Sequence, residues 1–226
     1  MNQVGVFVAI VGGSGAGKSW LAERLQQCLG KNCARIALDD FYCDRSHLPA
    51  GRRERINYDH PRAIDWRRVL QFLRDARAGR TTFVPQYDFK THARLAPQLW
   101  DPKAVVIFEG LWLLTRPAVR RHFDLSIFLN AAGWLRLRWR TERDVAERGR
   151  SPEMVRRQFI SQVGPMHIQH VAPQRRWADI VLKQKIGKPE IDQVAGAICG
   201  LMREDEGESS AKFNANDLFR GDESTL

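Results

Sequence analysis

Short apolar runs alternate along this chain with longer segments in which apolar residues recur at helical spacing. The apolar runs cover residues 4–11, 34–38, 104–108, 125–129 and 180–182. Runs of this length, rich in Val and Ile, predict buried strands. Apolar residues at helical spacing follow the first run at Leu21, Ala22, Leu25 and Leu29. A further helix is predicted over residues 63–78, with Asp65 as its N-cap.

The alternation of strands and helices favours an α/β fold, a doubly wound parallel sheet with helices on both faces. In such a sheet, ligands bind outside the carboxyl ends of the strands. The chain has 226 residues, of which 43% are hydrophobic, so it is long enough for one substantial core. We therefore expect a single domain over residues 1–203.

The segment between the first strand and the first helix is rich in glycine, with four glycines in the six residues from Gly12 to Gly17. Glycine weakens strand and helix interiors by about 0.5–1 kcal/mol, so this composition suits a loop that a ligand approaches closely. The order of residues fits G-x-x-x-x-G-K-S, in which backbone N–H groups hold phosphates, the lysine reaches the terminal phosphates and the serine hydroxyl ligates Mg²⁺. The alternative is a glycine-rich turn without a ligand. We predict a phosphate-binding loop of the P-loop NTPase type, formed by Gly12, Gly13, Ser14, Gly15, Ala16, Gly17, Lys18 and Ser19.

Acidic residues follow two of the predicted strands. Asp39 and Asp40 come directly after the second strand, and Glu109 follows the third. Acids at these strand ends would converge on the metal and the terminal phosphate, as metal ligands or as a base. The duller alternatives are a helix cap or surface acid for Glu109 and a loop cap for Asp40.

A basic helix is predicted around residues 136–150, with arginines at Arg136, Arg140, Arg143, Arg148 and Arg150. The first three share one helical face, and the last two follow near a glycine. One interpretation is a solvated helix, in which i,i+4 pairs such as Asp144 with Arg148 contribute about 0.2–0.5 kcal/mol each. The other is an arginine-bearing lid at about 136–158, which closes over a transferring phosphoryl group. The pattern alone favours neither.

The net charge of +10 is unevenly distributed. From Arg203 onward there are three basic and seven acidic residues, which leaves +14 on residues 1–202. A basic body suits either triphosphates or nucleic acid, and charge alone does not separate them. Residues 204–226 are acidic and lack apolar periodicity, so we predict a disordered tail.

The remaining composition points to a cytoplasmic protein. No apolar run approaches membrane-spanning length, and the start of the chain resembles a strand more than a signal peptide. The cysteines Cys28, Cys33, Cys43 and Cys199 lack metal-site spacing, and we expect them to be buried as small hydrophobic residues.

Several motifs then agree, in order, with one family. They are DDFY at 39–42, NYDHP at 57–61, PQYDFKTHAR at 85–94, VVIFEG at 105–110, RDVAERGR at 143–150, VGPMH at 163–167 and WADIVL at 177–182. With the phosphate loop, this series resembles the uridine-cytidine kinase family of P-loop kinases, relatives of phosphoribulokinase, over most of residues 4–182. A series of this kind is much more specific than the phosphate loop alone.

The resemblance implies a role for each matching position. Asp39 would be the general base on a nucleoside 5′-hydroxyl, and Ser19, Glu109 and Asp39 would surround Mg²⁺. Lys18, Arg143 and Arg148 would act on the triphosphate. The implied substrate-binding residues are Tyr58, Asp59, Tyr87, Phe89, His92, Arg140, Arg150 and Gln158.

Some of these residues also have structural explanations. Tyr87 and Phe89 could be core aromatics, His92 a satisfied loop histidine, and Asp59 a turn residue before Pro61. The sequence also departs from the family: Asp40 stands where serine is common, Trp139 interrupts an arginine pair, and KQKIGK lacks a usual glycine-acid contact near adenine.

The expected function is Mg²⁺- and ATP- (or GTP-) dependent transfer of the γ-phosphoryl group to the 5′-hydroxyl of uridine or cytidine, a step of pyrimidine salvage. Two alternatives remain open: a P-loop kinase for another small alcohol, such as ribulose 5-phosphate or pantothenate, and a regulatory or nucleic-acid-binding protein gated by nucleotide. Nucleic acid and membranes are not expected partners, and a homo-oligomer is allowed for.

Overall fold

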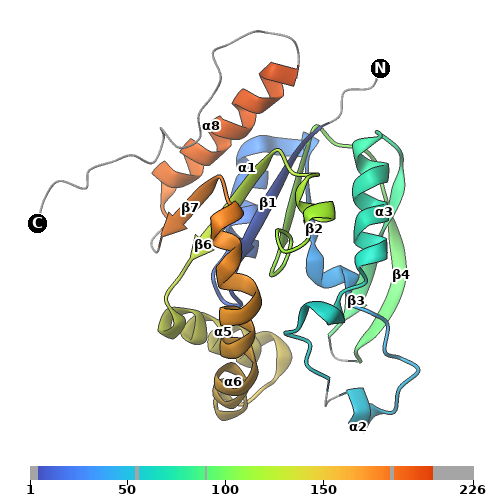
Figure 1. The fold of residues 1–226 in the computed structure, drawn as a ribbon, viewed down its shortest axis with the longest axis vertical. Helices are drawn as coiled ribbons and strands as arrows, with labels where there is room; N and C mark the ends of the chain where they lie inside the picture. The colour runs from blue at the N-terminus through green and yellow to red at the C-terminus, as the bar shows by residue number, and fades with distance from the viewer. Residues whose placement is uncertain (1–4, 54–55, 90, 184–185, 206–226) are drawn as a thin grey trace, which may run out of the picture.

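The computed structural model describes residues 5–53, 56–89, 91–183 and 186–205 (Figure 1). The strands are β1 (Val6–Gly12), β2 (Cys33–Ala37), β3 (Thr82–Asp88), β4 (Ala93–Trp100), β5 (Val105–Gly110), β6 (Leu125–Asn130) and β7 (Ile180–Lys183). The α-helices are α1 (Lys18–Leu29), α2 (Ala50–Arg53), α3 (Trp66–Arg77), α4 (Pro117–Arg120), α5 (Gly133–Arg148), α6 (Pro152–Gln158), α7 (Gly164–Met166) and α8 (Lys188–Asp205). Each of the five predicted strands is present, within two residues of its predicted bounds at either end.

The main sheet is parallel, with strand order β2-β5-β1-β6-β7. Because β2 and β5 lie on one side of β1 and β6 and β7 on the other, the chain changes direction across the sheet at β1. The carboxyl end of β1 is therefore the topological switch point at which ligands bind in such folds. The predicted fold class is confirmed.

Both faces of the sheet are covered, as a parallel sheet requires. All seven residues of β1 are buried. Phe7, Ala9 and Val11 belong to the hydrophobic cluster that contains α3. Val8 and Ile10 belong to the cluster that contains α1 and α8. Alternate side chains of one strand thus anchor helices on opposite faces, because successive strand residues point to opposite sides.

Helix α3 shows how a predicted element matches its sequence. The Asp65 carboxylate accepts a hydrogen bond from the backbone N–H of Arg68 at 3.3 Å, so Asp65 is the N-cap. The helix begins at Trp66, three residues later than predicted, because Pro61–Ala63 forms a 3-10 turn of its own.

Besides the short helices α2, α4, α6 and α7, two larger features were not predicted. The first is the antiparallel hairpin of β3 and β4, in which Pro85 and Pro97 interrupt the strand pattern. The second is α8, which contains Gly196 and Gly200 in its interior. Helix α8 includes Glu204 and Asp205, so the predicted disordered tail starts too early; the rest of that prediction, residues 206–226, lies outside the described residues.

The expected burial of cysteine is only partly correct. Cys33 is buried, but Cys28 and Cys199 are exposed and Cys43 is half-buried. Across the part of the chain that the structure describes, no helix has both the length and the apolar character needed to cross a membrane.

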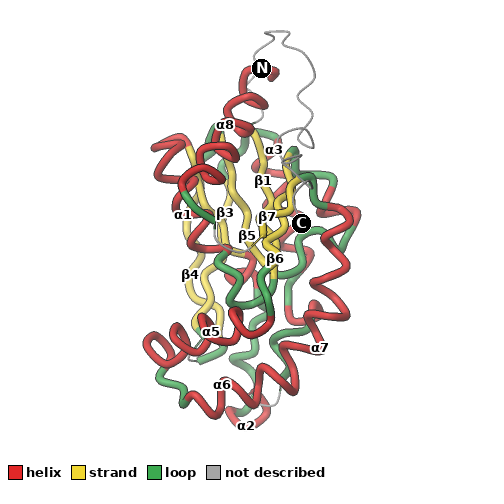
Figure 2. The backbone as a smooth tube through the Cα atoms, turned by 90° about the vertical axis from the view of Figure 1, so that its left-hand side faces the viewer, coloured by secondary structure: helices red, strands yellow, loops and turns green. Residues whose placement is uncertain are grey.

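Helices α5 and α6, which directly follow β6, lie at one end of the molecule. Helix α5 ends at Gly149, whose φ of +63° terminates the helix, and α6 begins after the N-cap Ser151. Figures 1 and 2 show α5 and α6 at the end of the sheet where β1 leads into the phosphate loop. The segment expected to form a lid is therefore close to the switch point.

Candidate active site

The phosphate loop connects β1 to α1, as predicted. Gly15 has a φ of +77°, and a Cβ there would overlap the backbone carbonyl oxygen of Arg136 on α5. Only glycine suits this position, because it combines a left-handed backbone with direct packing against another helix. The Lys18 ammonium donates a hydrogen bond to the carbonyl of Gly13 at 3.2 Å. Burial lowers the pKa of Lys18, and the carboxylates of Glu109 and Asp39 oppose that effect.

Two oxygen-bearing side chains meet beside this loop. The Ser19 hydroxyl donates a hydrogen bond to Glu109 Oε1 at 2.6 Å, and Glu109 is only 8% exposed. Burial raises the pKa of Glu109, while Lys18 and the Ser19 hydroxyl act against the rise. A hydroxyl and a carboxylate at a loop of the phosphate-binding type fit Mg²⁺, which takes few protein oxygens and completes its shell with phosphate and water. Among the described residues, no group of three or more His, Cys, Asp or Glu side chains is placed to hold a metal ion.

The tandem acids stand in a 3-10 turn, Leu38–Phe41, that directly follows β2. Burial is the main cause that raises the pKa of Glu109 and of Asp59, and the charge of Asp39 adds to both shifts, so Asp39 lies within electrostatic reach of both carboxylates. Burial, together with the neighbouring charge of Asp39, raises the pKa of Asp40 to about 6, although a backbone hydrogen bond from Tyr87 opposes the rise. The backbone of β3 thus contacts the Asp40 carboxylate directly.

An aromatic cluster lies beyond these acids. The rings of Tyr58 and His92 stack, with centroids 4.2 Å apart and planes inclined by 10°. Tyr87 Oη lies 3.4 Å from His92 Nδ1, and the Tyr87 ring packs against Phe89 at 5.4 Å. Tyr87 is only 7% exposed and belongs to the hydrophobic core, as the structural alternative expected. Phe89 and His92 are half-buried and extend the cluster outward.

Asp59 does not act as the side-chain acceptor of its turn. That acceptor is Asn57 Oδ1, which receives the backbone N–H of Asp59 at 3.0 Å. The Asp59 carboxylate is buried and lies 3.6 Å from Arg140 Nη1. Burial raises the pKa of Asp59, and Arg140 counteracts this. A role in forming the turn therefore does not explain why the Asp59 carboxylate is buried next to Arg140.

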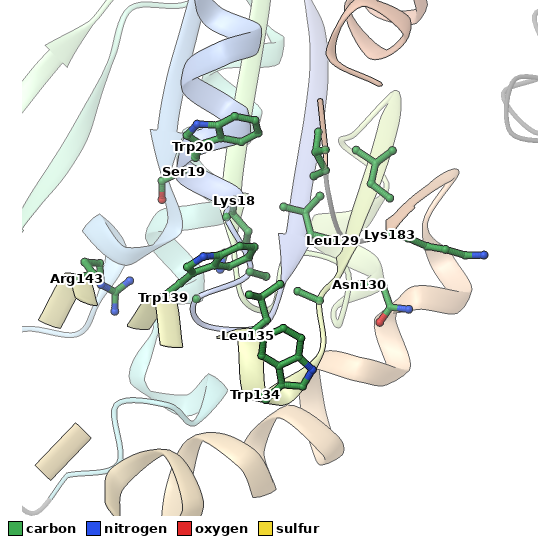
Figure 3. A pocket seen from close by; sticks show the side chains of 16 residues that line it. Lys18, Ser19, Trp20, Leu129, Asn130, Trp134, Leu135, Trp139, Arg143 and Lys183 are labelled. Carbon is green, nitrogen blue, oxygen red and sulfur yellow. The ribbon is translucent and has the colours of Figure 1, made fainter. Parts of the chain in front are cut away.

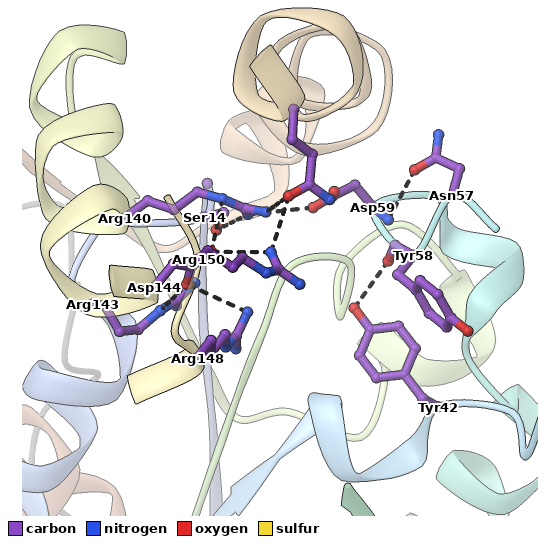
Figure 4. Close-up of polar contacts among 12 residues, drawn as sticks. Ser14, Tyr42, Asn57, Tyr58, Asp59, Arg140, Arg143, Asp144, Arg148 and Arg150 are labelled. Atoms are coloured by element: carbon purple, nitrogen blue, oxygen red, sulfur yellow. Dashed lines mark hydrogen bonds and ion pairs between the residues drawn. The ribbon is translucent and has the colours of Figure 1, made fainter. Parts of the chain in front are cut away.

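The buried face of α5 is charged. Its buried residues are Arg136, Arg140 and Asp144, so the interpretation of this face as solvated is wrong. Arg140 donates to Ser14 Oγ of the phosphate loop at 2.7 Å and to Gln158 Oε1 at 2.9 Å (Figure 4). Arg150 reaches the same Gln158 oxygen at 3.0 Å. The structure thus brings Arg140, Arg150 and Gln158 together next to the phosphate loop.

Asp144 is one residue whose role the sequence does not predict. The sequence predicts only a surface pair between Asp144 and Arg148, yet Asp144 is fully buried. The available signal was its spacing, since Asp144 stands four residues after Arg140 and eight after Arg136 and so shares their face.

A pocket of about 750 Å³ borders the phosphate loop, and Gly15, Gly17 and Lys18 are among the residues that line it. Its wall includes Trp20, Trp134 and Trp139, together with Lys18 and Arg143 (Figure 3). Trp134 is 67% exposed, which is unusual for so large an apolar side chain. The sequence pattern does not predict a pocket at these tryptophans, and of the three only Trp139 stands out in it, because it interrupts an arginine pair.

A phosphate loop at the switch point of a parallel sheet, with a hydroxyl-carboxylate pair and a nearby cluster of arginines, defines a P-loop kinase. The sequence model of the phosphoribulokinase / uridine kinase family matches residues 7–189. The chain belongs to this family, and it is a phosphotransferase that acts on an alcohol group.

Individual relatives agree with this assignment. The chain is 36% identical over 181 residues to the uridine kinase of Clostridium perfringens, covering 79% of this chain and 87% of the relative. It is 37% identical over 178 residues to the uridine kinase of Halobacterium salinarum, covering 78% and 79%. The structure of phosphoribulokinase from Rhodobacter spheroides superposes with a TM-score of 0.59 at 17% identity, covering 80% of this chain and 71% of that one. This last similarity concerns the fold alone.

Proposed function

We propose that the protein transfers the γ-phosphoryl group of Mg²⁺-ATP to the 5′-hydroxyl of a pyrimidine ribonucleoside, uridine or cytidine. One observation carries this proposal: Arg140 contacts both the phosphate loop, through Ser14, and the buried carboxylate of Asp59. A single buried side chain therefore joins the donor site to a separate polar and aromatic site. Such an arrangement suits a reaction between two substrates held on either side of it.

The donor compartment combines the phosphate loop with the tryptophan-lined pocket. Lys18 belongs to both, so a triphosphate on the loop would extend its nucleoside into that pocket. Flat aromatic walls suit a purine, which can stack on them. Mg²⁺ held by Ser19 and Glu109 would neutralise charge on the β- and γ-phosphates.

The acceptor compartment combines Asp59 with the stacked pair of Tyr58 and His92. A buried carboxylate is an acceptor for two vicinal ribose hydroxyls, and aromatic rings form flat walls for a nucleobase. The 36% identical relative is a uridine kinase, which supports a pyrimidine nucleoside as the acceptor.

Asp39 is the proposed base. As the 5′-oxygen attacks the γ-phosphorus, its proton passes to the Asp39 carboxylate, and the bond from the γ-phosphorus to the β–γ bridging oxygen breaks. Lys18, Arg143 and Arg148 neutralise the charge that develops on the departing diphosphate and the transferred group. In this proposal, catalysis depends on the positioning of the two substrates and on the neutralisation of charge by these cationic side chains.

The test is ADP release from Mg²⁺-ATP, measured with uridine, with cytidine and without an acceptor. We expect release only with a nucleoside. Asp39→Asn should abolish turnover and leave uridine binding nearly unchanged, whereas the matched Asp40→Asn should be milder. If ribulose 5-phosphate or pantothenate replaces the nucleoside as acceptor, the proposed substrate is wrong. If no acceptor stimulates release, the proposed reaction is wrong.

A further inference from the structure

Asp144 is surrounded by guanidinium groups. Its carboxylate accepts two hydrogen bonds from Arg143, at 2.9 and 2.7 Å, and lies 3.4 Å from Arg148 Nη1. It also lies 3.2 Å from Arg150 Nη1 and 3.5 Å from Arg140 Nε. The residue is fully buried, and Figure 4 shows it in the middle of the cluster. One carboxylate therefore contacts four arginines.

These arginines lead to different parts of the active site. Arg140 reaches Ser14 on the phosphate loop, and Arg143 lines the tryptophan pocket. The Arg148 guanidinium lies 4.8 Å from the centre of the Phe89 ring, in the aromatic cluster. Asp144 is thus a common anchor for side chains that serve both proposed compartments.

The electrostatics of the cluster need such an anchor. In the ion pairs of this cluster, four arginines face two carboxylates, those of Asp144 and Asp59. Burial by itself would raise the pKa of Asp144, but Arg143 and Arg148 outweigh that effect and hold the pKa below its usual value. An ionised Asp144 orders the arginines and still leaves an excess of positive charge for a polyphosphate.

We propose that Asp144 is a positioning residue, which holds the arginines of α5 and its C-terminal turn in the geometry that phosphoryl transfer requires. The reaction itself rests on the proposed function, but the preorganised binding of Mg²⁺-ATP does not depend on which alcohol accepts the phosphoryl group. Loss of the Asp144 charge would leave the arginines repelling one another and pointing away from their targets.

The test is Asp144→Asn, which keeps the size of the side chain and removes its charge. We expect kcat/KM to fall about 100-fold, the loss that a displacement of about 1 Å can cause. We expect Mg²⁺-ATP to bind about tenfold more weakly by calorimetry. The control is Glu142→Gln on the same helix, because Glu142 is exposed and, within the described part of the chain, forms an ion pair only with Arg138, at 2.9 Å. That variant should match the wild type.

A charge-specific readout separates positioning from simple packing. In Asp144→Asn the arginines lack their anion, so added sulfate should raise Tm more than it does in the wild type or in Glu142→Gln. A packing role would lower Tm without changing this response. Should Asp144→Asn fail to fold, Asp144→Glu keeps the charge but moves it by one methylene, so we expect weaker Mg²⁺-ATP binding with a sulfate response like that of the wild type.

The outcomes distinguish the two proposals. Without nucleoside-dependent turnover in the wild type, the proposed function fails, while weaker Mg²⁺-ATP binding and a larger sulfate response in Asp144→Asn still support the positioning role. If Asp144→Asn matches Glu142→Gln in binding, kinetics and sulfate response, the positioning role is wrong. The positioning role is also wrong if Asp144→Glu matches the wild type in Mg²⁺-ATP binding and in turnover.

Discussion

Helices α3 and α5 bury opposite kinds of side chain. Helix α3 buries Trp66, Val69, Phe72, Leu73 and Ala76. Helix α5 buries Arg136, Arg140 and Asp144 and leaves Trp134 and Trp139 67% and 38% exposed. Burial of apolar surface stabilises a fold by about 25 cal/mol per Å², whereas burial of charge costs free energy unless the charge is paired. We infer that α3 serves stability and that α5 serves the site.

The largest test of this difference is the double variant Arg143→Gln and Arg148→Gln on α5. If these arginines neutralise the transferring phosphoryl group, kcat should fall about 1,000-fold or more, as loss of an arginine at a phosphoryl-transfer site does. Tm should also fall, because the buried Asp144 loses two of its partners, but Arg140 and Arg150 remain beside it and the variant should still fold, so activity should suffer more than stability. The control is Arg138→Gln, an exposed arginine on the same helix. A lower Tm with unchanged kinetics would make α5 a structural helix like α3.

The reciprocal test is Leu73→Ala on α3. Leu73 is fully buried, and truncation of such a leucine lowers the free energy of unfolding by about 2–5 kcal/mol. Urea unfolding measures this loss, and Leu70→Ala, at a half-buried position of the same helix, should cost less. Turnover per folded molecule should not change. A lower kcat in folded Leu73→Ala would show that α3 also acts on the site.

Arg140 of α5 forms an ion pair with Asp59 in the proposed acceptor compartment, and variants of Asp59 test the role of this carboxylate. If Asp59 accepts hydrogen bonds from both ribose hydroxyls, a 2′-deoxy substrate loses an interaction worth roughly 1.5–3 kcal/mol. The kcat/KM for uridine should then exceed that for deoxyuridine by about ten- to a hundredfold. Asp59→Ala should compress this ratio and leave ATP binding intact. An unchanged ratio would place the ribose site elsewhere.

The smallest expected effect concerns the exposed apolar face of α5. Trp134→Ala should raise KM for ATP about tenfold with little change in kcat, because stacking of a base on an aromatic ring contributes about 1–3 kcal/mol. Trp134→Phe keeps a flat ring and should retain most of the affinity. Quenching of tryptophan fluorescence by ATP and by GTP, compared between the wild type and Trp134→Ala, reports the contact directly. Equal KM values in the wild type and Trp134→Ala would contradict the proposed stacking of the ATP base on Trp134.

Local patterns in the sequence were sufficient for much of the fold. The five parallel strands, the Asp65 cap of α3 and the glycine-rich loop from Gly12 to Ser19 depend on neighbouring residues, so their signals are complete within short segments. The β3–β4 hairpin and α8 were missed because Pro85, Pro97 and two glycines weaken the local pattern. Pairing of the two strands and packing of α8 on the sheet outweigh those local preferences.

Some features of the candidate site were likewise predictable from the sequence, and others depended on the tertiary structure. The chain by itself determined that a lysine and a serine end a phosphate loop and that arginines share a helical face. Only the tertiary structure decided which face of α5 is buried, because a helix of mixed composition can turn its arginines either to water or to a neighbour. It is the packing of α5 against the phosphate loop at Gly15 that makes Asp144 a buried anchor and leaves Trp134 exposed at a pocket. Burial is a property of the assembled elements, and no local pattern contains it.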